Sequence, residues 1–407
     1  MKKILCLVVA LSLVVFFSGQ ALAGTVLSRF DVSVGGYVKL DYINQSAKLG
    51  PLTAPVPADG SLKAGQDESL FTARQSRIHL KVKGPDFMGA KTTAFIEGDF
   101  YGPGGTNESP DFRMRHAYGA LAWKDTQVLF GQFWDIFGPL VSSTLDFRSG
   151  QFTGAPNNPR VPQIRLTHSF TLNDNNSLRV IVGAQNPVEN FKNESTSGDM
   201  VNFAGQAMLV SKALGVAPGY WGMPMKPLTV GFFGLWGKEK VNEQVVGSDP
   251  TEYVSHKNDI NVYGYGAYAF VPLLKSTDGK SRAMTLSLET QAYVAAGLDV
   301  IGATARNAVG SPNDPDAAKG YGVSGQFIFY PIQPLGITVG YGRRNILDSS
   351  DYSGAAEKYN EQYFGNVAYD LNSAVRVAAE YQRLKTSYLN DTSGKANRFM
   401  VSAMYFF

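Results

Sequence analysis

Residues 398–407 read RFMVSAMYFF, a strand-like stretch with strict alternation. Phe399, Val401, Ala403, Tyr405 and Phe407 share one face, because successive side chains of a strand point to opposite sides. Arg398, Met400, Ser402, Met404 and Phe406 share the other face. The first face is wholly apolar and ends in aromatic rings. It therefore packs either on a protein core or against another apolar phase.

The first 23 residues have the layout of a secretory signal peptide. Lys2 and Lys3 precede an apolar run from Ile4 to Phe17, and Ala21-Leu22-Ala23 is a small-x-small cleavage site. We expect residues 1–23 to be removed, with an uncleaved helical anchor as the alternative. Cys6, the single cysteine, lies in this segment, so the exported chain would contain no disulfide bond.

The composition of the exported chain excludes several classes of protein. Once Lys2 and Lys3 are removed, 35 basic residues face 34 acidic ones, so we expect no general attraction for nucleic acid. No later segment has eighteen consecutive apolar residues, so no transmembrane helix is expected after the leader. The 43 Gly, 20 Tyr and 25 Phe favour many strands and turns over long helices.

Segments with a period of two recur along the whole chain and predict 16 strands. They are 34–43, 71–83, 90–100, 112–123, 126–134, 163–170, 177–185, 200–212, 228–238, 259–271, 282–298, 319–330, 335–345, 360–371, 375–387 and 398–407. Most connections between them alternate between tight turns and long loops rich in Gly, Pro, Asn and Ser. Two connections that should be short, 213–227 and 272–281, are extended. This alternation is typical of a bacterial outer-membrane barrel with its turns at the periplasmic end.

Within each strand, apolar residues occupy one face and charged residues the other. A soluble barrel would turn the apolar face inward, and alternation alone does not distinguish the two cases. Three features indicate that the apolar faces meet lipid and not a protein core. The apolar faces end in aromatic residues, and a soluble barrel of 16 strands would have a core too wide for side chains to fill. The chain also carries an export signal but no cysteine after it. We therefore predict an all-β fold, a transmembrane antiparallel barrel of about 16 strands over residues 24–407. Its last strand pairs with its first, because unpaired backbone groups are costly in hydrocarbon.

If the apolar faces meet lipid, the charged faces line a lumen. The inward candidates by parity are Lys39, Asp41, Arg77, His79, Lys81, Glu97, Asp99, Arg165, Arg179, Glu289, Arg344, Arg376 and Glu380. Arg113 and Arg115 are placed inside too, although their parity would bring Leu121 and Trp123 with them unless a bulge intervenes. Opposed basic and acidic walls would orient dipolar solutes and favour water-soluble ions. The alternative is that these charges pair with one another and only brace the wall.

Residues 135–162 (DIFGPLVSSTLDFRSGQFTGAPNNPRVP) form the longest connection of the first half and the third long loop. In general porins the third long loop folds into the bore. Residues 135–162 are also the third long loop, so the resemblance to general porins implies a constriction here. Asp146, Arg148 and Arg160 would then be placed to filter solutes. An external cap is the alternative.

The block from Ser76 to Phe137 resembles porins of the DcaP-like family. It contains SRIHLKVKGPDFMGAKTTAFIEGDFYG, then RMRHAYGAL and VLFGQFWDIF, in the family's order. Position by position, these motifs carry Arg77, Glu97, Asp99, Arg113, Arg115 and Gln132. The resemblance implies a homotrimer of 16-stranded barrels that admits small, often anionic organic solutes such as dicarboxylates. DcaP has an N-terminal coiled coil before its barrel, whereas only a short stretch from Gly24 precedes the first strand here.

We therefore expect an outer-membrane porin of a Gram-negative bacterium, surrounded by lipid and open to small hydrophilic solutes. The alternatives are a transporter of hydrophobic substrates, an outer-membrane enzyme and an adhesive barrel. The four histidines carry no nucleophile motif, and no zinc spacing or P-loop is present, so we expect no enzyme, no metal and no cofactor. Tyr405 and Phe407 are the candidate recognition end for the barrel-assembly machinery, since many outer-membrane proteins end on an aromatic residue.

Overall fold

The computed structural model describes residues 30–49, 56–59, 61, 65–102, 104–147, 153–156, 159–187, 196–198, 200–246, 253–299, 301–311, 314–349, 352 and 356–407. The predicted leader, residues 1–23, and Arg148 lie outside these ranges.

Strands make up nearly all of the regular structure. Those of the main sheet are β1 Asp31–Gln45, β2 Glu68–Thr72, β3 Arg77–Lys83, β4 Lys91–Asp99, β5 Arg113–Ala122, β6 Thr126–Trp134, β7 Arg160–Thr171, β8 Asn176–Gln185, β9 Thr196–Gly198, β10 Asn202–Pro218, β11 Met225–Val246, β12 Tyr253–Leu274, β13 Thr285–Ala296, β16 Lys319–Ile332, β17 Leu335–Ile346, β18 Glu357–Asp370, β19 Val375–Tyr388 and β20 Ser393–Phe406. A separate hairpin joins β14 Ala308–Ser311 to β15 Asp314–Ala317, and one 3₁₀ turn, η1, spans Tyr220–Gly222.

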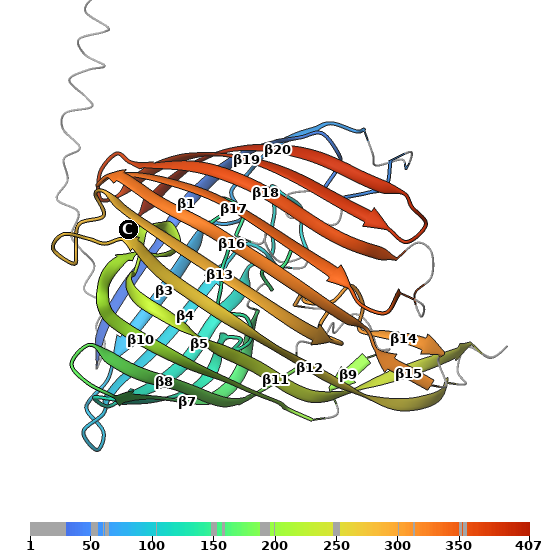
Figure 1. Ribbon diagram of the computed structural model, residues 1–407, viewed down its shortest axis with the longest axis horizontal. Helices are drawn as coiled ribbons and strands as arrows, with labels where there is room; N and C mark the ends of the chain where they lie inside the picture. The colour runs from blue at the N-terminus through green and yellow to red at the C-terminus, as the bar shows by residue number, and fades with distance from the viewer. Residues whose placement is uncertain are drawn as a thin grey trace, which may run out of the picture.

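The main sheet is one closed antiparallel barrel (Figure 1). Its 18 segments form 16 strands, because β2 and β3 pair with successive parts of β1, and β9 and β10 pair with successive parts of β11. The barrel closes where β20 pairs with β1, from Tyr37 opposite Phe406 to Gln45 opposite Arg398. The predicted fold class and all 16 predicted strands are confirmed.

The two faces of the sheet have opposite chemistry. On β20, Phe399, Val401 and Tyr405 are exposed on the outside, whereas Met400 and Ser402 are buried inside. Each of the 16 strands of the barrel pairs with a neighbour on both sides, so its backbone groups are paired where they meet hydrocarbon. Figure 1 shows the short turns gathered at the end that holds the C-terminus, and β14 and β15 at the opposite, long-loop end.

Strands take up most of connection 213–227 but only the first three residues of connection 272–281. β10 continues to Pro218 and β11 begins at Met225, so only residues 219–224, including η1, join them. Similarly, β12 reaches Leu274 and β13 begins at Thr285. Both remain at the short-turn end, and the first of them contributes to the interior described below.

Candidate pore and its inward loop

The described part of residues 135–162 lies inside the barrel and is bound by amide side chains of the wall. In these hydrogen bonds the loop contributes backbone N–H and C=O groups. Leu140 N donates to Gln291 Oε1 at 3.0 Å, Ser143 N donates to Gln326 Oε1 at 2.8 Å, and Asn366 Nδ2 donates to Ser143 O at 2.6 Å. Gln185 and Gln206 bind the backbone of Ile136 in the same way. These amides come from β8, β10, β13, β16 and β18, so the loop runs along much of the inner wall.

On the far side of the barrel the loop is held by buried charges. Arg398 Nη1 lies 3.1 Å from Asp146 Oδ2, and each side chain is about 1% exposed. Lys39 Nζ contacts Asp41 Oδ2 at 2.7 Å and Leu145 O at 2.8 Å. Glu380 Oε2 accepts from Leu145 N at 2.9 Å. The sequence placed Lys39, Asp41 and Glu380 on the lumen wall; they do face inward, but the loop covers them, so they hold the loop and do not line open space.

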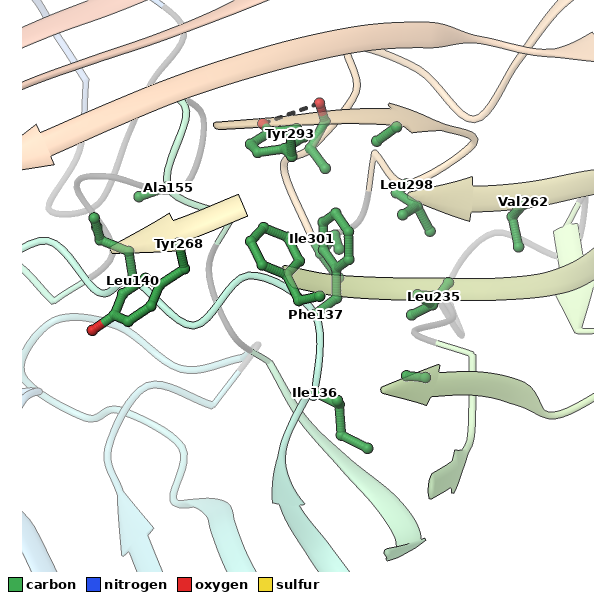
Figure 2. Close-up of a cluster of buried hydrophobic side chains, with 14 of the residues drawn as sticks. Ile136, Phe137, Leu140, Ala155, Leu235, Val262, Tyr268, Tyr293, Leu298 and Ile301 are labelled. Atoms are coloured by element: carbon green, nitrogen blue, oxygen red, sulfur yellow. Dashed lines mark hydrogen bonds between the residues drawn. The ribbon is translucent and has the colours of Figure 1, made fainter. Parts of the chain in front are cut away.

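An apolar cluster fixes the first part of the loop (Figure 2). Phe137 packs at 5.1 Å from the Phe233 ring and 5.8 Å from the Tyr293 ring. Figure 2 shows Phe137 beside Ile301, with Tyr293, whose hydroxyl donates to Ala303 O at 3.2 Å, close by. The interior on the side of β10 to β13 is therefore a packed hydrophobic core. An open space lies beside this core.

That open space is a cavity of about 380 Å³ between the loop and the wall. The described residues that line it include six cations and two carboxylates: Arg77, Arg113, Arg115, Arg160, Lys226 and Arg376, with Asp99 and Glu289. Aromatic rings, among them Tyr37, Trp134 and Phe147, fill much of the remaining lining. The interior field around this cavity is positive.

Three of the predicted arginines form one cluster on two predicted carboxylates. Arg113 binds Asp99 with both arms, at 3.0 and 2.8 Å. Arg115 bridges Glu97 at 2.8 Å and Asp99 at 2.7 Å, and Arg77 lies 3.5 Å from Glu97. Two-armed contacts of this kind fix a guanidinium firmly. The cluster therefore presents fixed positive groups to the cavity.

A β-bulge explains how both arginines of β5 face inward. Glu97 of β4 pairs with His116, but the next residue, Gly98, pairs with Met114, so Arg115 is the extra residue. Beyond the bulge the parity changes: His116 is buried, whereas Trp123 is exposed on the outside. The bulge thus removes the conflict between inward arginines and inward Leu121 and Trp123.

Arg160 adds a further cation to the cavity. Its guanidinium carbon lies 5.0 Å from the centroid of the Trp134 ring, at the start of β7. Among the described residues no carboxylate forms an ion pair with Arg160, and its Nε is buried without a hydrogen-bond partner. Asp146, predicted beside it in the filter, instead pairs with Arg398.

A second element reaches the cavity from the short-turn end. The turn between β10 and β11 places Tyr220 at 6.2 Å from the Phe147 ring of the inward loop. Trp221, in a left-handed conformation with φ 50°, accepts a hydrogen bond on its carbonyl from Arg376 at 3.3 Å. The abnormal length of connection 213–227 was the only sign of this element in the sequence.

The other predicted lining residues are spread over the wall. Arg165 and Arg179 stand on the inner faces of β7 and β8, and Arg165 lies 4.3 Å from the Phe133 ring. His79 stacks on Phe95 at 5.2 Å, and Lys81 follows on the same face towards the turns. Arg344 binds the carbonyls of Gly302 and Thr304 and pairs with Glu357. Glu289 is bound by Lys226 at 3.0 Å, and Arg376 pairs with Asp370.

Gln132 does not line the lumen, and its prediction is wrong. It pairs with Ala117 and Pro162, which belong to the outward face, and its amide donates to Met114 O and Arg115 O. It satisfies carbonyl groups at the β5 bulge.

Among the described residues, no helix is long and apolar enough to cross a membrane. No group of three or more His, Cys, Asp or Glu in these ranges is placed to hold a metal ion.

The closed barrel, its segregated turns and loops and its inward third loop define a channel of the porin class. The sequence model of the Gram-negative porin family matches residues 10–389, so the chain belongs to this family and is an outer-membrane channel. No curated protein sequence matches it.

Solved structures share its fold at low sequence identity. The outer-membrane channel DcaP of Acinetobacter baumannii is 18% identical with a TM-score of 0.70, over 93% of this chain and 97% of DcaP. OmpT of Vibrio cholerae, in a trimer form, is 14% identical with a TM-score of 0.54, over 93% and 99%. An anion-selective porin of Comamonas acidovorans is 12% identical with a TM-score of 0.54, over 93% and 99%. The resemblance to DcaP-like porins seen in residues 76–137 thus extends to the fold of most of the chain.

Proposed function

We propose that the barrel is a water-filled channel for passive diffusion of small hydrophilic solutes and that it favours anions. One observation carries the preference: the cavity beside the inward loop has six cations and two carboxylates among its described lining residues. Both carboxylates are already paired, Asp99 with arginines and Glu289 with Lys226. An entering anion would therefore meet positive groups, and neither carboxylate among the described lining residues would be free to repel it.

We further propose that residues 135–162 and the turn 219–224 together form the constriction. The loop narrows the lumen from the wall, and Tyr220 and Trp221 approach it from the short-turn end. A solute would pass between the arginine cluster on β3 to β5 and these aromatic rings. The proposed filter residues are Arg160, which has no carboxylate partner among the described residues, together with Arg113 and Arg115, which Asp99 holds in place.

Small carboxylates, including dicarboxylates, are the proposed solutes. Guanidinium groups bind carboxylates with two parallel hydrogen bonds, and several of them surround one cavity here. The description of the Comamonas porin as anion-selective agrees with this proposal. By analogy with the trimer form of Vibrio cholerae OmpT, we propose a homotrimer.

Planar-bilayer recording and vesicle swelling test the proposal. The refolded protein should give stable ohmic single-channel currents in KCl. Vesicles that contain it should swell faster in succinate than in a cationic solute of similar size. Absence of any current across several salt concentrations would contradict a water-filled channel. Equal swelling in both solutes would contradict the anion preference alone.

A further inference from the structure

The turn 219–224 joins two parts of the barrel wall that are far apart in the sheet. It leaves the wall between β10 and β11, whereas Arg376, whose Nη1 donates to Trp221 O at 3.3 Å, belongs to β19. Around the barrel, β12, β13, β16 and β17 lie between β11 and β18. Trp221 also packs on a buried apolar cluster that includes Ala378 of β19 and Met404 of β20. The turn therefore crosses part of the lumen at the short-turn end.

A single carboxylate fixes the two guanidinium groups beside this turn. Asp370, the last residue of β18, accepts from Arg376 Nε at 2.5 Å and from Arg282 Nη2 at 2.8 Å. Arg282 comes from the connection between β12 and β13, and its guanidinium carbon lies 5.0 Å from the centroid of the Tyr330 ring. Among the described residues, no other carboxylate forms an ion pair with either arginine. Asp370 thus determines where both guanidinium groups point.

Gly222 shows how closely the turn rests on these groups. Its φ is 85°, a left-handed conformation that favours glycine. A Cβ at this position would lie 2.7 Å from Arg282 Nη1 and 2.5 Å from Tyr330 Oη, so the wall leaves no room for a side chain. Arg376 binds the carbonyl of the preceding residue, Trp221. The two arginines thus contact consecutive residues of the turn.

We propose that Asp370 positions the turn 219–224 in the lumen. It does so through Arg282 and Arg376, which it holds against the turn, and the inference rests on the proposed role of this turn in the constriction. Asp370 is not among the described residues that line the cavity, so it acts through the arginines and not on the solute itself. Without its carboxylate, the two guanidinium groups would repel each other and lose their common acceptor. The turn would then lose its contact with β19 and leave the lumen more open.

Hydrogen exchange of the refolded full chain tests this contact directly. The amides of Gly222 and Met223 donate within the turn, so their exchange reports on its local opening. In Asp370→Asn these amides should exchange about tenfold faster, at the usual contribution of a hydrogen bond to a charged group. Amides of β16 and β17 should keep their wild-type rates.

Vesicle swelling in a series of uncharged sugars gives the functional readout. Uncharged solutes do not respond to the lost charge, so a change reports on the width of the passage. Asp370→Asn should raise the swelling rates of the larger sugars. A pure charge effect would shift ion selectivity and leave both the exchange rates and the sugar series unchanged, which would overturn the proposal.

Two matched variants complete the test. Arg376→Lys keeps the charge, but an ammonium lacks the fork that reaches Asp370 and Trp221 O together. It should therefore behave like Asp370→Asn, and it carries the test if that variant does not refold. Asp86→Asn removes a carboxylate paired with Lys91 at another short turn and should leave both readouts unchanged.

The distribution of the exchange separates this proposal from the proposed constriction. Faster exchange throughout the barrel would overturn the proposal, because Asp370 would then stabilise the whole sheet. Faster exchange confined to residues 219–224, with an unchanged sugar series, would support the role of Asp370 and contradict the part of the turn in the constriction.

Discussion

Asp146 of the inward loop and Arg398 of the closing strand form an ion pair of 3.1 Å with almost no solvent exposure. The pair joins the middle of the loop to the strand that completes the barrel. Loop position and barrel closure are therefore coupled through one buried contact.

Replacing Asp146 with Ala should release the loop from the wall. The substitution breaks a buried ion pair by removing the carboxylate, and such a loss costs about 3–5 kcal/mol. We expect a larger and noisier single-channel conductance. Glu108→Ala, an exposed carboxylate in another loop, is the control. A conductance equal to wild type would show that the pair does not position the loop.

Arg160→Gln should reduce the preference for anions. This cation has no carboxylate partner among the described residues, so its field acts directly on the cavity. We expect the permeability ratio of chloride to potassium to fall by about two- to fivefold. Arg343→Gln removes the same charge from the outer face and should leave the ratio unchanged. An identical ratio in both variants would remove Arg160 from the filter.

Trp221→Ala should raise the size limit for uncharged solutes. The ring lines the cavity from the short-turn end, and its removal widens the passage without changing a charge. Swelling rates of vesicles in a series of sugars measure the limit, and the larger sugars should gain most. Met284→Ala, at an exposed position of another turn, is the control. If the series is unaffected, residues 219–224 lie outside the solute path.

The base of the loop should loosen as the pH rises. Burial raises the pKa of Asp135 from its ordinary value of 3.8 to about 6, against hydrogen bonds from Phe137 N and Gln185 Nε2. Because the folded pKa is the higher one, the favourable contribution is complete below pH 3.8 and is lost as the pH passes 6. The loss is roughly 3 kcal/mol for a loop that returns Asp135 to water.

Hydrogen exchange at Phe137 to Leu140, corrected for intrinsic rates, measures this change between pH 5 and pH 8. Wild type should exchange faster at pH 8. Asp135→Asn keeps the acceptor oxygen but not the charge, so its protection should be independent of pH. A variant with the same pH response as wild type would assign the effect to another group.

The barrel could be predicted from the sequence because the alternation that specifies it lies within each single strand. Alternation along Phe399 to Tyr405 assigns each side chain to a face, and the closed sheet follows from the cost of unpaired backbone in lipid. Inward parity similarly placed Arg77, Glu97 and Asp99 on the wall. The β5 bulge left a visible sign, since Arg115 and Trp123 could not both keep their expected faces.

The route of the inward loop could not be predicted in this way. Its binding groups, such as Gln185, Gln291 and Asn366, come from strands far apart in the chain, and each alone is an ordinary polar residue of a wall. The alternation of side chains along a strand predicts that Lys39 and Glu380 face inward. It does not reveal that the inward loop covers them, because that depends on the route of the loop. Gln132 was placed in the lumen only because it belongs to a motif shared with the family. The sequence did not show that its amide satisfies carbonyl groups at the β5 bulge.

The reversal potential of the refolded protein in a KCl gradient tests the central claim most directly. If the arginine cluster and Arg160 filter the solutes, the sign of the reversal potential should show that chloride permeates faster than potassium. The triple variant Arg77→Gln, Arg113→Gln, Arg160→Gln should move that potential towards zero or beyond it. A wild-type potential at zero or of the potassium sign, or a triple variant with the wild-type potential, would contradict the account.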